Sequence, residues 1–320
     1  MRKIKIVQIG VGHDHASAIW DCLLNMPDIF DFAAFAVPDV EKEKFPERIA
    51  ELSKKVPFLS IDEALSLPGL DAAAIETEEV ALTDCALAAA EKGLHIHMDK
   101  PGGLELATFE KLIDILKAKK LIFSTGYMYR FNPLISEAIA RAKSGELGEI
   151  YSVEAHMDCV HPPEKRQWLD RFPGGMMFYL GCHLIDLIYQ IQGEPDEIIP
   201  MNTSTEYKID GAEDFGMAVL KYPHGVSFAK TCAAEPGGFM RRQLVICGTK
   251  GPLELRPLEA YLPDNEKSGR RDLCTVMRSA ANPKNSYDWK FDGTREKCIC
   301  SRKKVIRTPI LRGEFPILLR

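Results

Sequence analysis

Apolar residues in the first 125 positions form short runs that alternate with amphipathic segments. The runs predict strands at 3–9, 32–37, 71–75, 94–98 and 121–125. The amphipathic segments predict helices at 16–24, 41–54, 78–92 and 105–119. Alternation of strands and helices is typical of a parallel, doubly wound sheet. We therefore expect residues 1–125 to form an α/β domain of the Rossmann-like type.

The pattern changes after Gly126. Helices are predicted at 133–143 and 175–192, and strands at 150–157, 197–206, 212–222, 226–233 and 243–247. Consecutive strands with short turns favour an antiparallel open sheet, so residues 126–320 are predicted to be an α+β domain for substrate binding and oligomerisation. Such a sheet can bury one face on helices and the other on a second subunit, so we expect a homodimer or homotetramer through it.

Composition narrows the class of protein. The 320 residues are 46% hydrophobic and 27% charged, which suits two globular domains. The net charge of -5 gives no electrostatic footprint for nucleic acid or for an anionic membrane surface. No apolar run approaches the ~20 residues that span a bilayer, and segment 3–9 is too charged for a secretory signal. Nine scattered cysteines indicate reduced thiols, so we expect a cytoplasmic protein.

Two features near the carboxyl end do not indicate a functional site. Cys298 and Cys300 lack the spacing and the second pair of a zinc site. The basic cluster at 302–307 is short, and we expect a solvated tail there.

A glycine-rich loop, Gly10-Val11-Gly12, follows the first predicted strand and precedes the first helix. Backbone amides at a helix N-terminus can hold a pyrophosphate, and glycine allows it to approach closely. This loop supplies five predicted cofactor-binding residues: Gly10, Gly12, His13, Asp14 and His15. The complete motif has Gly or Ala where this chain has His15, although Ala16 follows, and an ordinary tight turn is the alternative.

The His13-Asp14-His15 run resembles a metal-binding cluster. Adjacent residues on a turn point in different directions, however, and no third ligand is evident from the sequence. We therefore predict no metal site, and expect His13 and Asp14 to cap the first helix or to border the phosphates.

Two further segments are predicted to border the cofactor. Pro38 and Asp39 end the second strand, where an acidic residue commonly binds the adenosine ribose, while Lys42 and Lys44 leave NAD and NADP both open. Thr77 and Glu78 lie in the acidic run 76–79 after the third strand. Thr77 is predicted to cap the next helix, and the glutamates suit its first turn. Those carboxylates would also compete with the phosphates of a cofactor.

Catalytic chemistry is predicted at two places. Asp99 and Lys100 follow the fourth strand, at the sheet edge where open α/β sheets bind ligands. Lys100 can donate to a substrate hydroxyl and stabilise a developing alkoxide; the alternative is a surface turn. If 175–192 is one helix, Tyr179, His183 and Asp186 share a face. His183 suits proton transfer, and the alternative is a core histidine bonded to Asp186.

The ordered set of motifs resembles the glucose-fructose oxidoreductase, inositol dehydrogenase and rhizopine-catabolism (Gfo/Idh/MocA) family over positions 3–255. The motifs lie in the glycine-rich loop and at 93–101, 126–133, 174–175, 181–186 and 248–251. The resemblance implies hydride transfer between NAD or NADP and a sugar, polyol or cyclitol. It implies that Lys100 bridges the substrate hydroxyl and the nicotinamide ribose, with Asp99 in place of the usual Glu, and that His183 is the general acid/base.

The resemblance also implies that Tyr127, Arg130 and Trp168 border the substrate. Tyr179 stands where the family often has Asp, so proton relay would be weaker or would run through Asp186. Segment 298–320 lacks the usual final helix pattern. These departures keep a second hypothesis open, a non-catalytic ligand-binding or nucleotide-binding sensor on the same fold. Hydrolase or lyase chemistry with a transient cofactor is a third hypothesis, with no residue of its own.

Overall fold

The computed structural model describes residues 2–206, 211–261, 273–275 and 277–279. These residues form two compact units that divide between Met128 and Tyr129. Cys298, Cys300 and the basic cluster at 302–307 lie outside the described residues, as does segment 298–320 as a whole. Within the described ranges, no helix is both long enough and apolar enough to cross a bilayer.

The first unit contains a five-stranded parallel sheet in the order β2-β1-β3-β4-β5. Its strands are β1 (Ile4–Ile9), β2 (Phe30–Ala36), β3 (Ala72–Ile75), β4 (His95–Met98) and β5 (Phe123–Thr125). The predicted α/β fold with a parallel sheet is therefore confirmed.

A sixth strand position is reduced to one residue. Phe58 makes an isolated parallel bridge with Phe35 on the outer side of β2. The amide of Phe35 donates to the carbonyl of Pro57 at 2.9 Å, and the amide of Leu59 donates to the carbonyl of Phe35 at 3.0 Å. Counting this bridge as a strand gives the strand order of the dinucleotide-binding α/β fold.

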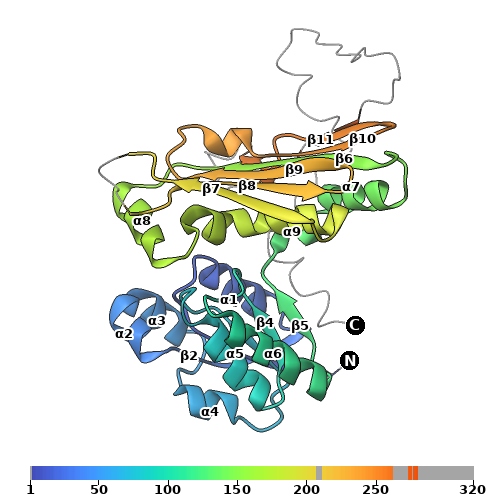
Figure 1. Cartoon of the computed structure of the whole chain (residues 1–320). Helices are drawn as coiled ribbons and strands as arrows, with labels where there is room; N and C mark the ends of the chain where they lie inside the picture. The colour runs from blue at the N-terminus through green and yellow to red at the C-terminus, as the bar shows by residue number, and fades with distance from the viewer. Residues whose placement is uncertain (1, 207–210, 262–272, 276, 280–320) are drawn as a thin grey trace. The chain divides into compact units, whose positions relative to one another are not determined.

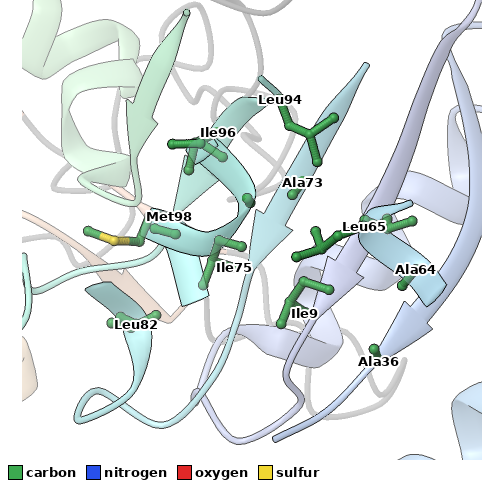
Figure 2. Close-up of a cluster of buried hydrophobic side chains, with 14 of the residues drawn as sticks. Ile9, Ala36, Ala64, Leu65, Ala73, Ile75, Leu82, Leu94, Ile96 and Met98 are labelled. Atoms are coloured by element: carbon green, nitrogen blue, oxygen red, sulfur yellow. The ribbon is translucent and has the colours of Figure 1, made fainter. Parts of the chain in front are cut away.

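Helices cover both faces of this sheet. They are α1 (Ala16–Asn25), α2 (Asp39–Lys44), α3 (Pro46–Ser53), α4 (Ile61–Leu65), α5 (Leu82–Glu91) and α6 (Leu106–Lys119). Figure 2 shows the core under α4 and α5, where Ile9, Ile75 and Ile96 of neighbouring strands pack together. On the opposite face, Ile6 packs against Ile19 and Leu23 of α1. Removing these side chains from water is the main favourable contribution to the fold.

Two predicted helices differ from the structure. The segment 41–54 contains two helices, because the amide of Phe45 closes α2 and Pro46 begins α3, a position that proline favours. The helix predicted at 78–92 begins four residues later than expected, at Leu82. Its N-cap is Ala81, which makes no side-chain capping hydrogen bond. The prediction that Thr77 caps this helix is therefore wrong.

The second unit contains a seven-stranded sheet in the order β14-β11-β10-β6-β9-β8-β7. Its strands are β6 (Ile150–Asp158), β7 (Glu197–Thr203), β8 (Phe215–Tyr222), β9 (Gly225–Cys232), β10 (Gln243–Gly248), β11 (Gly251–Leu255) and β14 (Met277–Ser279). Only the β6–β9 pair is parallel, so the predicted mainly antiparallel sheet is confirmed. A separate pair joins β12 (Ala260–Tyr261) and β13 (Leu273–Cys274).

The α-helices of the second unit lie along one face of this sheet (Figure 1). They are α7 (Pro133–Lys143), α8 (Pro163–Trp168) and α9 (Cys182–Gln192). A π-helical turn at Met177–Gly181 precedes α9, so the predicted helix 175–192 is not regular throughout. Asn132 caps α7 through its side-chain oxygen, which accepts the amides of Leu134 and Ile135.

Candidate active site

The glycine-rich loop fits closely against the turn after β3. Gly10 has φ +92°, and a Cβ there would lie 2.4 Å from the amide nitrogen of Thr77. Only glycine combines this backbone angle with so close an approach. The loop is therefore fixed against the segment that connects β3 to α5.

The loop amides hold a carboxylate supplied by the chain itself. Val11 and Gly12 donate their backbone N–H groups to Oε2 of Glu41 at 2.8 and 3.0 Å. The amide of Glu78 donates to the other oxygen of Glu41, Oε1, at 2.6 Å. We call these three hydrogen bonds the Glu41 contact. Glu41 is fully buried on α2.

Burial has an electrostatic cost for this carboxylate. Desolvation raises the pKa of Glu41, and its three backbone hydrogen bonds only partly offset that effect. The nearby Glu78 carboxylate also disfavours a second negative charge, although Lys44 donates to Glu78 at 2.6 Å. Arg48 closes the other side of the loop by donating to the carbonyls of Val11, Gly12 and His13.

The Glu41 carboxylate stands in for a phosphate oxyanion and tests whether a dinucleotide would fit. It shows that the amides of Val11 and Gly12 can hold an anion just before α1, where the pyrophosphate of NAD or NADP is held in this fold. A Cβ on Gly12 would lie 2.7 Å from Glu41 Oε1, so the glycine is needed for this approach. The loop therefore fits the cofactor, provided that Glu41 leaves the amides.

His13, His15 and Asp99 meet beside the loop. Nδ1 of His13 lies 3.2 Å from Oδ2 of Asp99, and Nδ1 of His15 lies 3.0 Å from the same oxygen. One donor atom from each of the three lies within 4.8 Å of the others, an arrangement that could hold a metal ion. The absence of a third ligand, on which the prediction of no metal rested, is thus contradicted by Asp99.

Burial and neighbouring charges set the protonation of this group. Burial lowers the pKa of His13 to about 3, so its imidazole is neutral at physiological pH. Burial also raises the pKa of Asp99, but the attraction of His13, His15 and Lys100 outweighs it and holds that pKa well below the usual range. A second buried histidine, His97, has its pKa lowered to about 4, again chiefly by desolvation.

Lys100 follows directly at the carboxyl end of β4. Its side chain is only 3% exposed. Its amide donates to Oδ1 of Asp99 at 2.6 Å, and its carbonyl lies 2.9 Å from Nε2 of His13. The backbone of Lys100 is thus held by both the strand end and the glycine-rich loop. These contacts fix the point on the backbone from which its side chain extends.

In the second unit, His183 lies near the start of α9 and is 2% exposed. Its ring makes an edge contact with Tyr129, with ring centroids 5.1 Å apart. Burial raises the pKa of the Tyr129 phenol well above its usual value, and the nearby carboxylate of Glu259 adds to this effect. The buried ion pair between Arg242 and Glu259 therefore lies beside the tyrosine that His183 contacts.

The three residues predicted on one helix face have different partners. Tyr179 lies on the π-helical turn and packs against Trp168, with centroids 5.3 Å apart. Asp186 lies on α9 and accepts hydrogen bonds from two nitrogens of Arg130: Nε lies 3.0 Å from Oδ1 and 2.9 Å from Oδ2, and Nη2 also donates to Oδ1. The wider π turn interrupts the regular spacing that placed Tyr179, His183 and Asp186 on one face.

The remaining predicted residues lie in varied settings. Tyr127 is half-buried in the first unit, and Asp14 and Asp39 are exposed. Pro38 is the N-cap of α2, and Asp39 pairs with Lys42 at 2.7 Å. Thr77 donates its hydroxyl to the carbonyl of Glu78 at 3.0 Å.

Sequence reasoning missed Glu41, Arg48 and Tyr129. Glu41 and Arg48 lie in an amphipathic segment rich in ordinary surface charges, so no local signal distinguishes them. Tyr129 lies between Tyr127 and Arg130, which were predicted to border the substrate, and the sequence gives no reason to prefer it.

Comparison with a protein-family model supports the resemblance seen in the motifs. Residues 135–254 match the GFO/IDH/MocA C-terminal domain. Among curated relatives, the chain is 30% identical to an uncharacterised oxidoreductase, YhhX, of Escherichia coli over 158 residues, which is 48% of this chain and 44% of that protein. It is 24% identical to the myo-inositol 2-dehydrogenase of Thermotoga maritima over 230 residues, which is 70% of this chain and 66% of that protein. The chain thus spans less than two thirds of the length of these relatives.

Solved structures show the same fold. An inositol dehydrogenase homologue from Azotobacter vinelandii, solved with NADH and myo-inositol, aligns with a TM-score of 0.70 at 19% identity and covers 88% of this chain and 76% of that one. The WlbA dehydrogenase of Bordetella pertussis, in complex with NADH and UDP-GlcNAcA, aligns with a TM-score of 0.68 at 19% identity, over 79% of this chain and 78% of that one. At these identities the likeness establishes the fold.

Proposed function

Because the chain carries a GFO/IDH/MocA C-terminal domain, we propose that it is an NAD(P)-dependent oxidoreductase that transfers a hydride between nicotinamide and a sugar, polyol or cyclitol-like substrate. The observation that carries the proposal is the anion held by the amides of Val11 and Gly12 at the carboxyl end of β1. Relatives named inositol and xylose dehydrogenases support this substrate class.

The proposed roles rest on the resemblance to the family and on where each side chain lies within its own unit. The bound cofactor would supply a hydride acceptor or donor at the carboxyl edge of the parallel sheet. Lys100, at that edge, would donate from its ammonium group to the reacting hydroxyl and stabilise the negative charge that develops on oxygen. His183 would take or return the hydroxyl proton, with Tyr129 packed against its ring to hold its orientation.

The other predicted residues keep proposed roles at this site. Tyr127, Arg130 and Trp168 are proposed to border the substrate. The salt bridge between Arg130 and Asp186 favours a positioning role for both residues, since each fixes the other. Tyr179 is proposed to shape the pocket through its aromatic contacts rather than to relay a proton.

The first experiment is a fluorescence titration of the protein with NADH and NADPH, followed by a screen of sugars, polyols and cyclitols. Lys100→Ala and His183→Asn should each lower kcat/KM by about 10²–10⁴-fold, the usual contribution of a positioned acid or base. Lys92→Ala and His224→Asn, at exposed positions, are the matched controls. Turnover that survives in both site variants would refute the assigned roles.

A second candidate is a non-catalytic sensor on the same fold, and the Glu41 contact favours it. A carboxylate that occupies the phosphate-binding amides would keep nucleotide out at low concentration. Nucleotide binding without turnover across the substrate panel would support the sensor. Turnover of any substrate that depends on Lys100 would exclude it.

We also propose self-association and a cytoplasmic location. The face of the large sheet opposite its helices carries exposed apolar side chains, among them Met201 and Val226. A second copy of the chain would cover them as a homodimer or homotetramer, which light scattering can test. Six cysteines whose side chains the structure describes form no disulfide there, which is consistent with a reducing compartment.

A further inference from the structure

A group of metal-ligand side chains joins the glycine-rich loop to the end of β4. It consists of His13 and His15 from the loop and Asp99 from the strand end. Their ring nitrogens lie 3.2 and 3.0 Å from the same carboxylate oxygen. Ligands about 2.0–2.2 Å from a tetrahedral ion lie roughly 3.3–3.6 Å apart. The two distances to Asp99 are close to this spacing, and the two ring nitrogens, which lie within 4.8 Å of each other, would draw together when an ion binds.

The hydrogen bonds of His13 fix which nitrogen can bind an ion. Nε2 lies 2.9 Å from the carbonyl of Lys100, which can only accept, so Nε2 carries the proton. Nδ1 therefore presents a lone pair, and at present it accepts the amide of His15 at 3.1 Å. A ligating histidine that donates its other N–H to a backbone carbonyl is the usual second-shell arrangement of metal sites.

Asp99 completes the set with a fully buried carboxylate, whose Oδ2 lies 3.0 Å from Nδ1 of His15. Its Oδ1 accepts the amide of Lys100. Its Oδ2 faces the lone pair of His13 Nδ1 as well as His15 Nδ1. Two acceptor atoms 3.2 Å apart repel each other unless a positive charge lies between them.

We propose that His13 Nδ1, His15 Nδ1 and the Asp99 carboxylate form a binding site for one divalent transition-metal ion of the zinc or cobalt type. Two imidazoles and one carboxylate match the ligand preference of these ions, whereas Mg²⁺ and Ca²⁺ prefer oxygen ligands throughout. His13 and Asp99 are fully buried, and the His15 side chain is 26% exposed, so the site opens to solvent on the side of His15. The remaining coordination positions would take water or an oxygen of a small ligand.

An ion there would connect the loop before α1 to the strand end that carries Lys100. It would therefore stabilise the folded state as well as bind a ligand, since it binds the folded arrangement and not the unfolded chain. This inference does not depend on hydride transfer, and its test uses no nucleotide.

The test uses the untagged, full-length protein after treatment with chelator. Calorimetric titration with Zn²⁺ should give one equivalent of tight binding, and Mg²⁺ should give none. Cobalt should produce visible d–d bands of a nitrogen and oxygen site, and Zn²⁺ should raise Tm. His15→Ala and Asp99→Asn should each weaken Zn²⁺ binding by at least about tenfold. Circular dichroism of both variants checks that they are folded.

The matched control is His224→Ala, which removes an exposed histidine of a surface turn. It should leave the affinity, the stoichiometry and the Tm shift unchanged. Loss of binding in the control with full binding in folded His15→Ala would show a surface ion only and overturn the proposal. An intense thiolate-to-cobalt band would assign the ion to cysteines and overturn it too.

Discussion

Removing the side chain of Glu41 should tighten the binding of NADH or NADPH. In the structure this carboxylate occupies the amides of Val11 and Gly12, which a pyrophosphate would need, and it also accepts the amide of Glu78. Wild-type protein must break the Glu41 contact before nucleotide enters. Glu41→Ala has no such competitor.

The size of the effect follows from two opposing contributions. A hydrogen bond to a charged group contributes about 1.5–3 kcal/mol, so the three bonds of the Glu41 contact together strongly favour Glu41 on the loop amides. Burial of the charge costs several kcal/mol in the opposite direction, and the raised pKa of Glu41 is the sign of that cost. We expect a net of about 1–3 kcal/mol, which is roughly 5- to 150-fold in Kd.

The assay is a fluorescence titration of NADH and NADPH into wild type, Glu41→Ala and Glu41→Gln at constant ionic strength. Glu41→Gln should give an intermediate Kd, because its amide oxygen still accepts a hydrogen bond but carries no charge. Glu43→Ala, at an exposed position on the same helix, is the control and should match wild type. An unchanged Kd in folded Glu41→Ala would refute the competition, and a weaker Kd would show that Glu41 is itself a nucleotide ligand.

Four further outcomes are expected. Since the pKa of Glu41 in the loop is raised above 4.5, protonation favours the carboxyl in the buried loop over a carboxyl displaced into water, so wild-type nucleotide affinity should fall relative to Glu41→Ala as pH falls through the raised value; a constant ratio of the two affinities would contradict this. By the same linkage, Glu41 contributes fully to the free energy of unfolding below pH 4.5, and this contribution is lost as pH rises through the raised pKa of the folded state. Urea unfolding of Glu41→Gln should lack this pH-dependent contribution. Gly10→Ala should lower the free energy of unfolding by about 2–4 kcal/mol, because its Cβ would press on neighbouring backbone, whereas Gly69→Ala, with open space around it, should cost only about 1 kcal/mol; equal losses would argue against close packing at the loop. Lys44→Ala should change stability by less than about 1 kcal/mol, because its ion pair with Glu78 is half-exposed at the lysine, and a larger loss in thermal unfolding would show that the pair is structural.

The first unit could be predicted well from the sequence because its signals are local. Each parallel strand is a short apolar run, and the glycines that end β1 and α5 are needed for positive φ angles at Gly10 and Gly93. The two-helix structure of 41–54 was missed, although Pro46 was visible, because the hydrophobic period continues across it. The late start of α5 was missed because Thr77 is a residue type that often caps helices. In the structure it packs against Gly10, and its hydroxyl donates to the carbonyl of Glu78.

The chemistry of the site was predicted less completely, because it depends on contacts between distant segments. Asp99 lies 84 positions from His15 and bonds to it, a pairing that no spacing rule gives. Glu41 resembles its exposed neighbours in sequence and differs in being buried against the glycine-rich loop. The π-helical turn before His183 changes which side chains share a face, and the sequence carries no signal that predicts such a turn.

The single bridge between Phe35 and Phe58 bears on aggregation. A strand at the edge of a sheet offers its unpaired amides and carbonyls to any other extended chain. In β2 the outward amide and carbonyl of Phe35 are already taken by Pro57 and Leu59, and the rings of Phe35 and Phe58 stack with centroids 4.9 Å apart. One paired residue thus shields the middle of an apolar edge, so weakening that short segment would expose β2 as a template on which copies of the protein could assemble into insoluble sheets.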